Sequence, residues 1–429
     1  MRRLIKAVAA ALVLASIVGH TSKADVVGEI EAELKAAVID RRDYPFLAVH
    51  VETAAGEVVV SSAVANPQFF AASASPEIND WMRIWSMSKL VTIVLALDLV
   101  ESGALALDDK AATYIPELSG MRVARSSSRG SLPQLSQASY ELTSNDSQAS
   151  EPCDYLLESP SRPMTVHDLM IHSAGFYYAT TNLPCLDRPL AKMELPLAHS
   201  TNEWLAGITR LPLIQSPDEG YYYGLNTTVL GFVLERATGK SLQTLLEERL
   251  LNPYGIEGLS FILPQRATLP PRVSGADGTL RLAKPMELDI FGGHQPPYGS
   301  DTTLFLGGEG LVATAPGFAK FLRVVFFSQE TGVPPVLEPQ SIAAMTRPQT
   351  NADSGWGAMG YGLWLSNGRR PDGTYGRDNI WTGGGYEGTQ YWIDPIKRQV
   401  GVMMTQVFMP PTSGLSMDNK VRDILDASD

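Results

Sequence analysis

Apolar positions along the chain alternate between strand-like and helix-like spacing. Helical spacing predicts a helix over 25–40, and short apolar runs at 46–51 and 58–62, separated by Ala55-Gly56, predict a strand pair. Strand-like runs and a closing helix follow near the C-terminus, at 362–365, 389–393, 400–405 and 418–425. Strands at both ends with helices between them predict one α/β body interrupted by a helical insert.

The middle of the chain is predicted to be mainly helical. Its most apolar run, Leu90–Leu97, follows Lys89 directly, and Gly103 suits the end of that helix. Further helical patterns lie at 165–171, 227–238, 242–250 and 318–327. In contrast, 264–300 is rich in Pro and Gly, which indicates a long loop.

The predicted organisation follows from these patterns. We expect an α/β body built from about 25–85 and 300–429, with a helical insert at about 86–299. A serine-rich stretch at 122–162 is expected to be an irregular insertion within the helical part. Residues 25–429 would then form one continuous functional unit.

The first 24 residues have the composition of a signal peptide. Arg2, Arg3 and Lys6 precede an apolar run at 7–19, and Ser22-Lys23-Ala24 offers a small-x-small cleavage site. A retained membrane anchor is the alternative, but this apolar run is too short to span a bilayer. We expect the mature chain to start near Asp25 and to work in the periplasm or outside the cell.

The composition narrows the classes of partner. The 429 residues carry a formal net charge of −12, and 44% of them are hydrophobic. Negative charge disfavours nucleic acid and anionic membrane surfaces as partners. No run after the leader is apolar and long enough to be transmembrane, so no membrane insertion is expected after cleavage.

Two cysteines are present, Cys153 and Cys185. In an oxidising compartment they could pair and close a loop of about 30 residues, for about 3–4 kcal/mol in the chain-entropy model. Two free thiols are the alternative. Neither these cysteines nor the six histidines show metal-ligand spacing, so we expect no metal and no cofactor.

Ser86 and Lys89 are the strongest candidates for chemistry. They are three residues apart at the start of the apolar helix, so both side chains would lie on one face. A serine hydroxyl needs a neighbour to remove its proton, and a buried lysine can do so. A Ser-His-Asp mechanism is the alternative, but no serine in the chain has glycines at both −2 and +2.

The Ser86–Lys89 motif and two later segments occur along the chain in the order typical of a known superfamily. They are Trp85–Leu90, Pro163–Gly175 and Gly307–Thr314. Together they resemble the serine β-lactamase and penicillin-binding-protein superfamily, most closely the class C β-lactamases and the family VIII carboxylesterases. The resemblance implies an α+β fold: an antiparallel sheet flanked by helices, plus a mostly helical subdomain. It also implies an acyl-enzyme on Ser86 and a small ester, lactam or peptide as substrate.

The resemblance places the family's catalytic tyrosine at Tyr223. The family usually has asparagine two residues later, where this chain has Leu225, and Asn226 follows one place further on. Leu225 and Asn226 are therefore the candidates for substrate contact here. A shift of register towards Tyr221 or Tyr222 is the alternative.

The third family element is a Lys-Thr-Gly strand beside the serine. This chain has Trp381-Thr382-Gly383-Gly384-Gly385 instead, with Trp381 in the place of the lysine. Glycines let substrate approach the strand backbone closely. We expect an oxyanion hole from the N–H groups of Ser86 and a residue near Gly384. Loss of the lysine removes a contact for an anionic substrate and so favours uncharged esters.

Some nearby residues have less specific roles. His172 is expected to brace a turn, and Phe176, Tyr177 and Tyr178 could equally line the pocket or pack in the core. Three functions remain open: an esterase, a β-lactamase, D,D-peptidase or amide hydrolase with the same residues, and a non-catalytic binding protein. The oligomeric state cannot be read from the sequence.

Overall fold

The computed structural model describes residues 23–71, 75–126, 155–285, 287, 290–291, 294–350, 357–370, 373–411 and 416–428. Most of residues 1–24, where a signal peptide is expected, most of the stretch 122–162, and Cys153 lie outside these ranges. Across the described ranges, no helix has the length and apolarity needed to span a bilayer.

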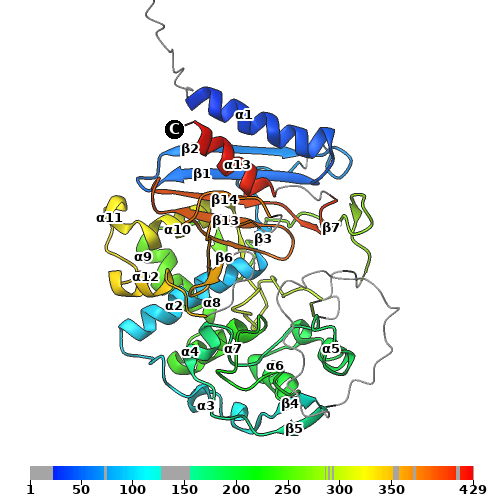
Figure 1. Cartoon of the computed structure of the whole chain (residues 1–429), viewed down its shortest axis with the longest axis vertical. Coiled ribbons are helices and arrows are strands. Elements are labelled where there is room, and N and C mark those ends of the chain that lie inside the picture. The colour runs from blue at the N-terminus through cyan, green and yellow to red at the C-terminus, as the bar shows by residue number, and fades with distance from the viewer. Residues whose placement is uncertain are drawn as a thin grey trace, which may run out of the picture.

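A seven-stranded antiparallel sheet forms the centre of the molecule (Figure 1). Its spatial order is β10-β11-β12-β13-β14-β1-β2, so strands from the two ends of the chain meet at β14 and β1. The strand bounds, in spatial order, are Ala358–Met359, Trp364–Leu365, Trp381–Gly384, Gln390–Asp394, Gln399–Met404, Phe46–Thr53 and Val58–Ala65. Every strand of this sheet comes from 46–65 or 358–404, within the two stretches expected to build the body.

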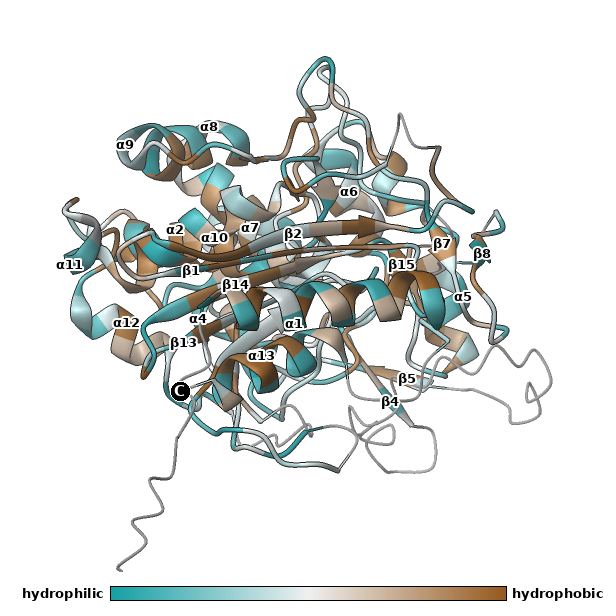
Figure 2. Ribbon diagram, turned by 90° about the horizontal axis from the view of Figure 1, so that it is seen from above, coloured by the Kyte–Doolittle hydropathy of each residue, from teal (hydrophilic) through white to brown (hydrophobic). Residues whose placement is uncertain are grey.

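Alternation along β1 explains why both faces of the sheet are covered. Leu47, Val49 and Val51 belong to one apolar cluster, whereas Phe46 and Ala48 belong to the other. α1 (Lys23–Lys35) and α13 (Met417–Ala427) lie over the first face, as Figures 1 and 2 show. α10 (Ala315–Phe326) packs against β1 and β14 on the opposite face. A sheet with two buried faces needs such layers on both sides.

The remaining helices gather on the α10 side of the sheet (Figure 1). Chief among them is α2 (Ser88–Glu101), of which 11 of 14 residues are buried. A helix that is apolar all round belongs in a core. The others are α3 (Ala111–Tyr114), α4 (Val166–Met170), α5 (Pro184–Ala191), α6 (Thr201–Ile208), α7 (Asn226–Thr238), α8 (Leu242–Leu246), α9 (Asn252–Tyr254), α11 (Ser328–Thr331) and α12 (Pro339–Met345).

Short strands complete the fold. β4 (Val123–Ser126) and β5 (Tyr155–Glu158) form a hairpin at the two ends of the irregular insertion. β3 (Met82–Arg83), which ends shortly before Ser86, and β6 (Leu259–Ser260) flank β9 (Val312–Ala313). The expected loop at 264–300 contains β7 (Val273–Ser274) and β8 (Arg281–Leu282), and β7 pairs with β15 (Val407–Phe408).

Cys185 lies in α5 and is disulfide-bonded. Cys153, the other cysteine of the chain, lies outside the described residues. α5 itself was not predicted from the apolar pattern, because it is short and contains two prolines.

Candidate active site

Ser86 lies in a 3₁₀ turn, Trp85–Met87, that leads directly into α2. Trp85 has a positive φ of 45°, and the Met87 N–H donates to the Ile84 carbonyl at 3.1 Å. On the other side, the Leu311 N–H donates to Ser88 Oγ at 3.1 Å. These contacts fix the turn, so Ser86 stands at the N-terminal end of the buried helix.

The Lys89 side chain meets Ser86 as the i, i+3 spacing predicts. Its Nζ lies 3.2 Å from Ser86 Oγ and also donates to the Gly308 carbonyl and to Tyr178 Oη, both at 2.9 Å. Lys89 is only 2% exposed, and burial lowers its pKa, while the nearby Glu309 carboxylate opposes that shift. Lowering the pKa favours the neutral amine, which can accept a proton from Ser86.

Tyr223 is the tyrosine that the structure brings to Ser86. Its hydroxyl is hydrogen-bonded to Ser86, and its ring centroid lies 5.0 Å from Lys89 Nζ. Burial raises the pKa of Tyr223; the hydrogen bond to Ser86 opposes this and the Glu309 charge adds to it. A raised pKa favours the protonated phenol, which is a hydrogen-bond and proton donor.

His172 braces the tyrosine segment, as expected. It is fully buried with φ of 57°, and its carbonyl accepts from the Tyr222 N–H at 2.8 Å. Its Nδ1 lies 3.4 Å from the Gly224 N–H, and its ring lies over Tyr223 at 4.7 Å between centroids. Burial first, and then the charge of Lys89, holds the pKa of His172 well below its usual range. A neutral imidazole in this place orients Tyr223.

Leu225 and Asn226 do not take the substrate-contacting positions expected from the sequence. Both are completely buried, with Leu225 in the apolar core. The Asn226 amide donates to the Phe176 carbonyl at 3.2 Å and lies 3.1 Å from His172 Nδ1. The one-residue displacement turns this amide towards the interior at the start of α7, where it supports the catalytic turn.

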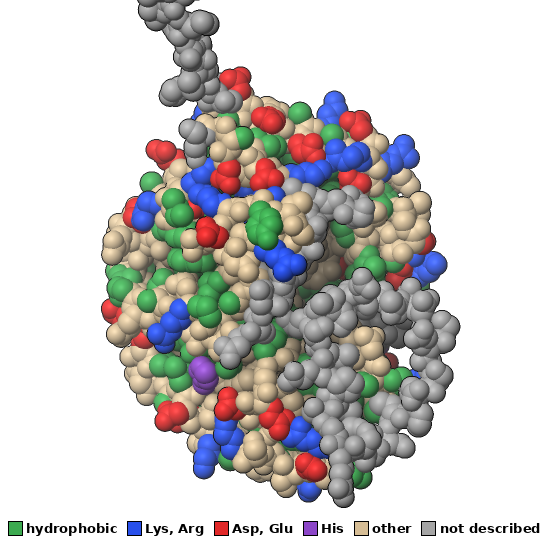
Figure 3. All heavy atoms as spheres, in the orientation of Figure 1, with side chains coloured by type: hydrophobic (Ala, Val, Ile, Leu, Met, Phe, Trp, Pro, Cys, Tyr) green, Lys and Arg blue, Asp and Glu red, His purple; other side chains and the backbone are tan. Residues whose placement is uncertain are grey.

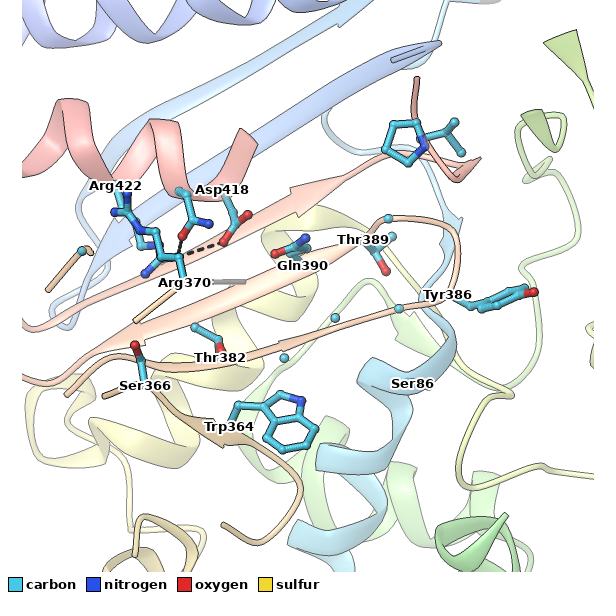
Figure 4. Close-up of a pocket in the computed structure, with 18 of the residues that line it drawn as sticks. Ser86, Trp364, Ser366, Arg370, Thr382, Tyr386, Thr389, Gln390, Asp418 and Arg422 are labelled. Atoms are coloured by element: carbon cyan, nitrogen blue, oxygen red, sulfur yellow. Dashed lines mark hydrogen bonds and ion pairs between the residues drawn. The ribbon is translucent and has the colours of Figure 1, made fainter. Parts of the chain in front are cut away.

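The glycine strand β12 runs alongside Ser86 (Figure 4). Thr382, Gly383, Gly384 and Gly385 line the same cavity as Ser86. A Cβ on Gly385 would collide with the Ile84 carbonyl and with Thr389 Oγ1. Glycine is thus required for the close approach of this strand to the nucleophile turn.

Strand register points to the Gly384 N–H as an oxyanion donor. The Gly385 N–H donates to Thr389 at 2.7 Å, and antiparallel ladders alternate in direction, so the Gly384 N–H points away from β13. On that other side β11 pairs only with Trp381 and Thr382. The described strands therefore leave this N–H directed towards the cavity.

Trp381 has a different position from the one expected for a substitute of the family lysine. Its ring packs against Phe326 of α10, with 5.7 Å between centroids. Thr382, the next residue, lines the cavity instead. Alternation along β12 explains the difference, because neighbouring side chains point to opposite faces of the sheet.

The cavity has a volume of about 450 Å³. Near Ser86 it is mainly aromatic and apolar, lined by Tyr178, Tyr223, Ile290, Trp364, Tyr386 and Phe408. Its other end holds charged groups from α13 and the β11–β12 connection, visible beside β12 in Figure 4. Arg422 pairs there with Asp418 at 3.0 Å, and Arg370 pairs with Asp423. On the face in Figure 3, basic and acidic side chains are interspersed.

Two further residues of the site, Glu309 and Thr228, were missed from the sequence, and a third, Tyr178, was expected either in the pocket or in the core. Glu309 contacts Lys89 at 3.2 Å and accepts hydrogen bonds from Tyr178 and Thr228. A charged residue enclosed by glycines in an otherwise apolar loop was the available signal for Glu309. Tyr178 was left open between pocket and core, and Thr228 carried no signal. Within the described ranges, no group of three or more His, Cys, Asp or Glu side chains could hold a metal ion.

The family follows from a match over most of the chain. Residues 48–426 match the family model described as Beta-lactamase. The chain belongs to the beta-lactamase family. This assignment agrees with the contacts that Ser86 makes with Lys89 and Tyr223.

Among the relatives of this beta-lactamase-family protein is the lovastatin esterase of Penicillium rubens, 26% identical over 90% of this chain and 94% of its own. An uncharacterized protein of Mycobacterium tuberculosis is also 26% identical, over 67% of this chain, and the match spans 64% of that relative's length. EstB, an esterase of Burkholderia gladioli, is 25% identical over 49% of this chain and 46% of its own.

Solved structures confirm the fold. EstCE1, described as a hydrolase with promiscuous acyltransferase activity, superposes with a TM-score of 0.72 and 17% identity, covering 94% of this chain and 99% of its own. Simvastatin synthase LovD from Aspergillus terreus gives a TM-score of 0.66 and 21% identity, with 94% and 97% covered. The expected architecture, an antiparallel sheet with flanking helices, is confirmed.

Proposed function

We propose that this protein is a serine esterase that forms an acyl-enzyme on Ser86 and acts on small uncharged esters. The observation that carries the proposal is the contact of Ser86 Oγ with both Lys89 Nζ and the Tyr223 hydroxyl, beside the open glycine strand. Nucleophile, proton acceptor and proton donor thus meet at one end of an aromatic cavity.

The reaction follows from these positions. Ser86 Oγ attacks the ester carbonyl as Lys89 accepts its proton, and the N–H groups of Ser86 and Gly384 receive the oxyanion. The tetrahedral intermediate then collapses, Tyr223 passes a proton to the leaving alkoxide, and Lys89 returns the Ser86 proton to Tyr223. Water attacks the acyl-enzyme by the same route and releases the acid.

The distribution of charged side chains around the cavity supports an uncharged substrate. β12 presents Thr382 and glycines to the cavity, and no lysine is found in the Trp381–Gly385 element. Arg370 and Arg422 at the far end are already paired with aspartates. The lovastatin esterase relative, which covers nearly the whole chain, is consistent with ester chemistry.

The test compares an ester with a lactam. Purified protein should hydrolyse a short-chain nitrophenyl ester with a kcat/KM at least ten times that for a chromogenic cephalosporin. The reverse preference would rule out the esterase assignment in favour of a β-lactamase, D,D-peptidase or amide hydrolase using the same residues.

Acyl transfer is a second candidate, favoured by the relatives named as methylbutanoyltransferases of Aspergillus terreus and Penicillium citrinum. The aromatic wall of the cavity could hold an apolar alcohol in place of water. Adding a primary alcohol to the ester assay should then yield a new ester alongside the acid. If a fluorophosphonate probe labels nothing, both catalytic functions fail and a binding protein remains.

We also propose that the protein is exported. The basic and apolar pattern of residues 1–24 supports this, as does the disulfide at Cys185, because disulfides persist in oxidising compartments. N-terminal sequencing of the protein from cell fractions should find it outside the cytoplasm, starting near Asp25. A cytoplasmic protein with an intact N-terminus would contradict export.

A further inference from the structure

Glu309 is a carboxylate with no solvent exposure beside the catalytic lysine. Its Oε1 lies 3.2 Å from Lys89 Nζ and accepts a short hydrogen bond from Tyr178 Oη. Its Oε2 accepts from Thr228 Oγ1 at 2.5 Å. Donors from α2, from the segment after α4 and from α7 therefore converge on one side chain.

The glycine loop brings this carboxylate into the core. A Cβ on Gly308 would lie 2.7 Å from Thr228 Oγ1 and 3.3 Å from Lys89 Nζ. The loop backbone is thus pressed against both helices, and a side chain on Gly308 would push the carboxylate away from Lys89. The Gly308 carbonyl itself accepts from Lys89 at 2.9 Å.

The burial of the Glu309 carboxylate has a large cost in free energy. Removing a carboxylate from water costs several kcal/mol, which only close ionic and hydrogen-bonded partners offset. An apolar residue would leave Lys89 without a counter-charge. The only cation within contact of Glu309 in the described part of the chain is Lys89, the group on which the nucleophile depends.

We propose that Glu309 is the positioning residue that stores the nucleophile's proton through Lys89, an inference that rests on the proposed acyl-enzyme function. In the form of the site in which Lys89 is protonated, its ammonium group donates to Glu309 Oε1. As the bond between Ser86 Oγ and the acyl carbon forms, Lys89 releases one proton and takes up the Ser86 proton in its place. Lys89 passes one of its own protons to Glu309, directly or by exchange through the Tyr178 hydroxyl.

The step balances when the intermediate collapses. The bond from the acyl carbon to the leaving oxygen breaks, and the alkoxide takes the Tyr223 proton. Tyr223 regains a proton from Lys89, and Lys89 regains the stored proton from Glu309. No proton is gained or lost overall, because the negative charge leaves Glu309 as the oxyanion forms and returns to Glu309 once Tyr223 has been reprotonated.

The test is the pH dependence of the Glu309→Gln variant. In the variant the proton can be accepted only by neutral Lys89, so the ascending limb of kcat/KM should move to higher pH by at least one unit. kcat at neutral pH should fall about 10²-fold, the scale of one general acid–base contribution, with KM within about threefold. If Glu309 were only a counter-charge to Lys89, its loss would lower the pKa of Lys89 further, and the limb would move to lower pH instead. A limb that moves to lower pH or stays in place would overturn the proposal.

The other titratable groups near the pair are accounted for in the same assay. Tyr178 contacts both members, Tyr223 and His172 lie beside Lys89, and Tyr298 is within electrostatic range of Glu309. None of them is altered in the variant. The matched control is Glu235→Gln, the same change at a carboxylate that caps Leu242 and contacts Thr201 away from the site. Its profile should remain that of the wild type.

Labelling of Ser86 by a fluorophosphonate separates this inference from the esterase proposal. If the wild type is labelled but hydrolyses no ester, the esterase assignment fails, and the pH dependence of labelling tests Glu309 instead. If labelling of Glu309→Gln depends on pH as it does in the wild type, Glu309 does not store the proton. The proposal also fails if the wild type is not labelled at all. If Glu309→Gln does not fold, Tyr178→Phe decides. This variant removes the hydrogen bond that Tyr178 donates to Glu309, so the ascending limb of the pH profile should again move to higher pH. A limb that does not move refutes the proposal.

Discussion

At the scale of single residues, every proposed step depends on the Ser86 hydroxyl, whose oxygen attacks the substrate. Its Oγ is 3.2 Å from Lys89 Nζ, and the turn that carries it is fixed by neighbouring backbone contacts. The side chain itself adds little to packing, since Trp85 and Met87 on either side fill the core.

Ser86→Ala should therefore abolish ester hydrolysis while leaving stability nearly unchanged. We expect turnover at the uncatalysed background, and a thermal midpoint within about 2 °C of the wild type. Initial rates and a melting curve measure both. Retained turnover in a folded variant would refute the nucleophile assignment.

Tyr223→Phe tests the proton donor without disturbing the ring. The ring keeps its contacts with His172 and Lys89, and only the hydroxyl bonded to Ser86 is lost. kcat should fall about 10²–10⁴-fold with little change in KM. Tyr222→Phe is the matched control, and a larger loss there would favour the alternative register of the tyrosine segment.

At the scale of elements, β12 and the nucleophile turn must approach within contact distance. A Cβ on Gly385 would strike the Ile84 carbonyl one residue before Trp85. The strand or the turn would have to move, and small displacements of reacting groups are costly for catalysis.

Gly385→Ala should lower kcat about 10²-fold, because the oxyanion donors and Ser86 would no longer share one geometry. Gly120→Ala is the control, since a Cβ there meets nothing within 4 Å. Steady-state kinetics on the nitrophenyl ester measures both variants. Equal activity of the two would show that the approach of β12 to the turn is not required.

At the scale of the whole molecule, a buried ion triad joins distant parts of the chain. Glu387, in the turn after β12, has no exposure and contacts Arg83 at 2.8 Å and Arg272 at 2.6 Å. Burial raises the pKa of Glu387, but the charges of Arg83 and Arg272 outweigh it, so the pKa is lowered. The Arg272 guanidinium also lies over the ring of Trp85, 5.7 Å from its centroid.

A lowered pKa fixes the direction of the pH effect. The ionised carboxylate contributes stability that is present above the unfolded pKa of about 4.3 and is lost as pH falls through the folded value. Glu387→Gln should cost about 3–5 kcal/mol at pH 7, because it leaves the buried Arg83 and the half-buried Arg272 without their partner. Urea unfolding at pH 7 and pH 4 should show that the free energy of unfolding falls less between these pH values in the variant than in the wild type. Equal losses would exclude Glu387 as a source of the acid sensitivity.

The spacing of apolar residues predicted most of the helices and strands, because buried side chains recur with the period of each element. The helix over 25–40 is observed as α1 and a following π turn, and the C-terminal strands as β13 and β14. Short or proline-containing helices such as α5 and α6 were missed, because they have too few turns to show a period. Pairing of β1 with β14 joins segments about 350 residues apart, which no local pattern encodes.

By itself, the sequence determined the chemistry that depends on local spacing. The i, i+3 relation of Ser86 and Lys89 on a buried helix is a property of helical geometry and needs no distant contact. The glycines of β12 and the tyrosine segment were likewise readable in order along the chain.

Only the tertiary structure decided which side chains those residues meet. It turned Asn226 inward, packed Trp381 against Phe326 of α10, and placed Glu309 and Tyr178 against Lys89. Each outcome depends on packing between elements far apart in the chain. The charge and pKa of a buried group are set by its neighbours in space, and those neighbours exist only once the chain has folded.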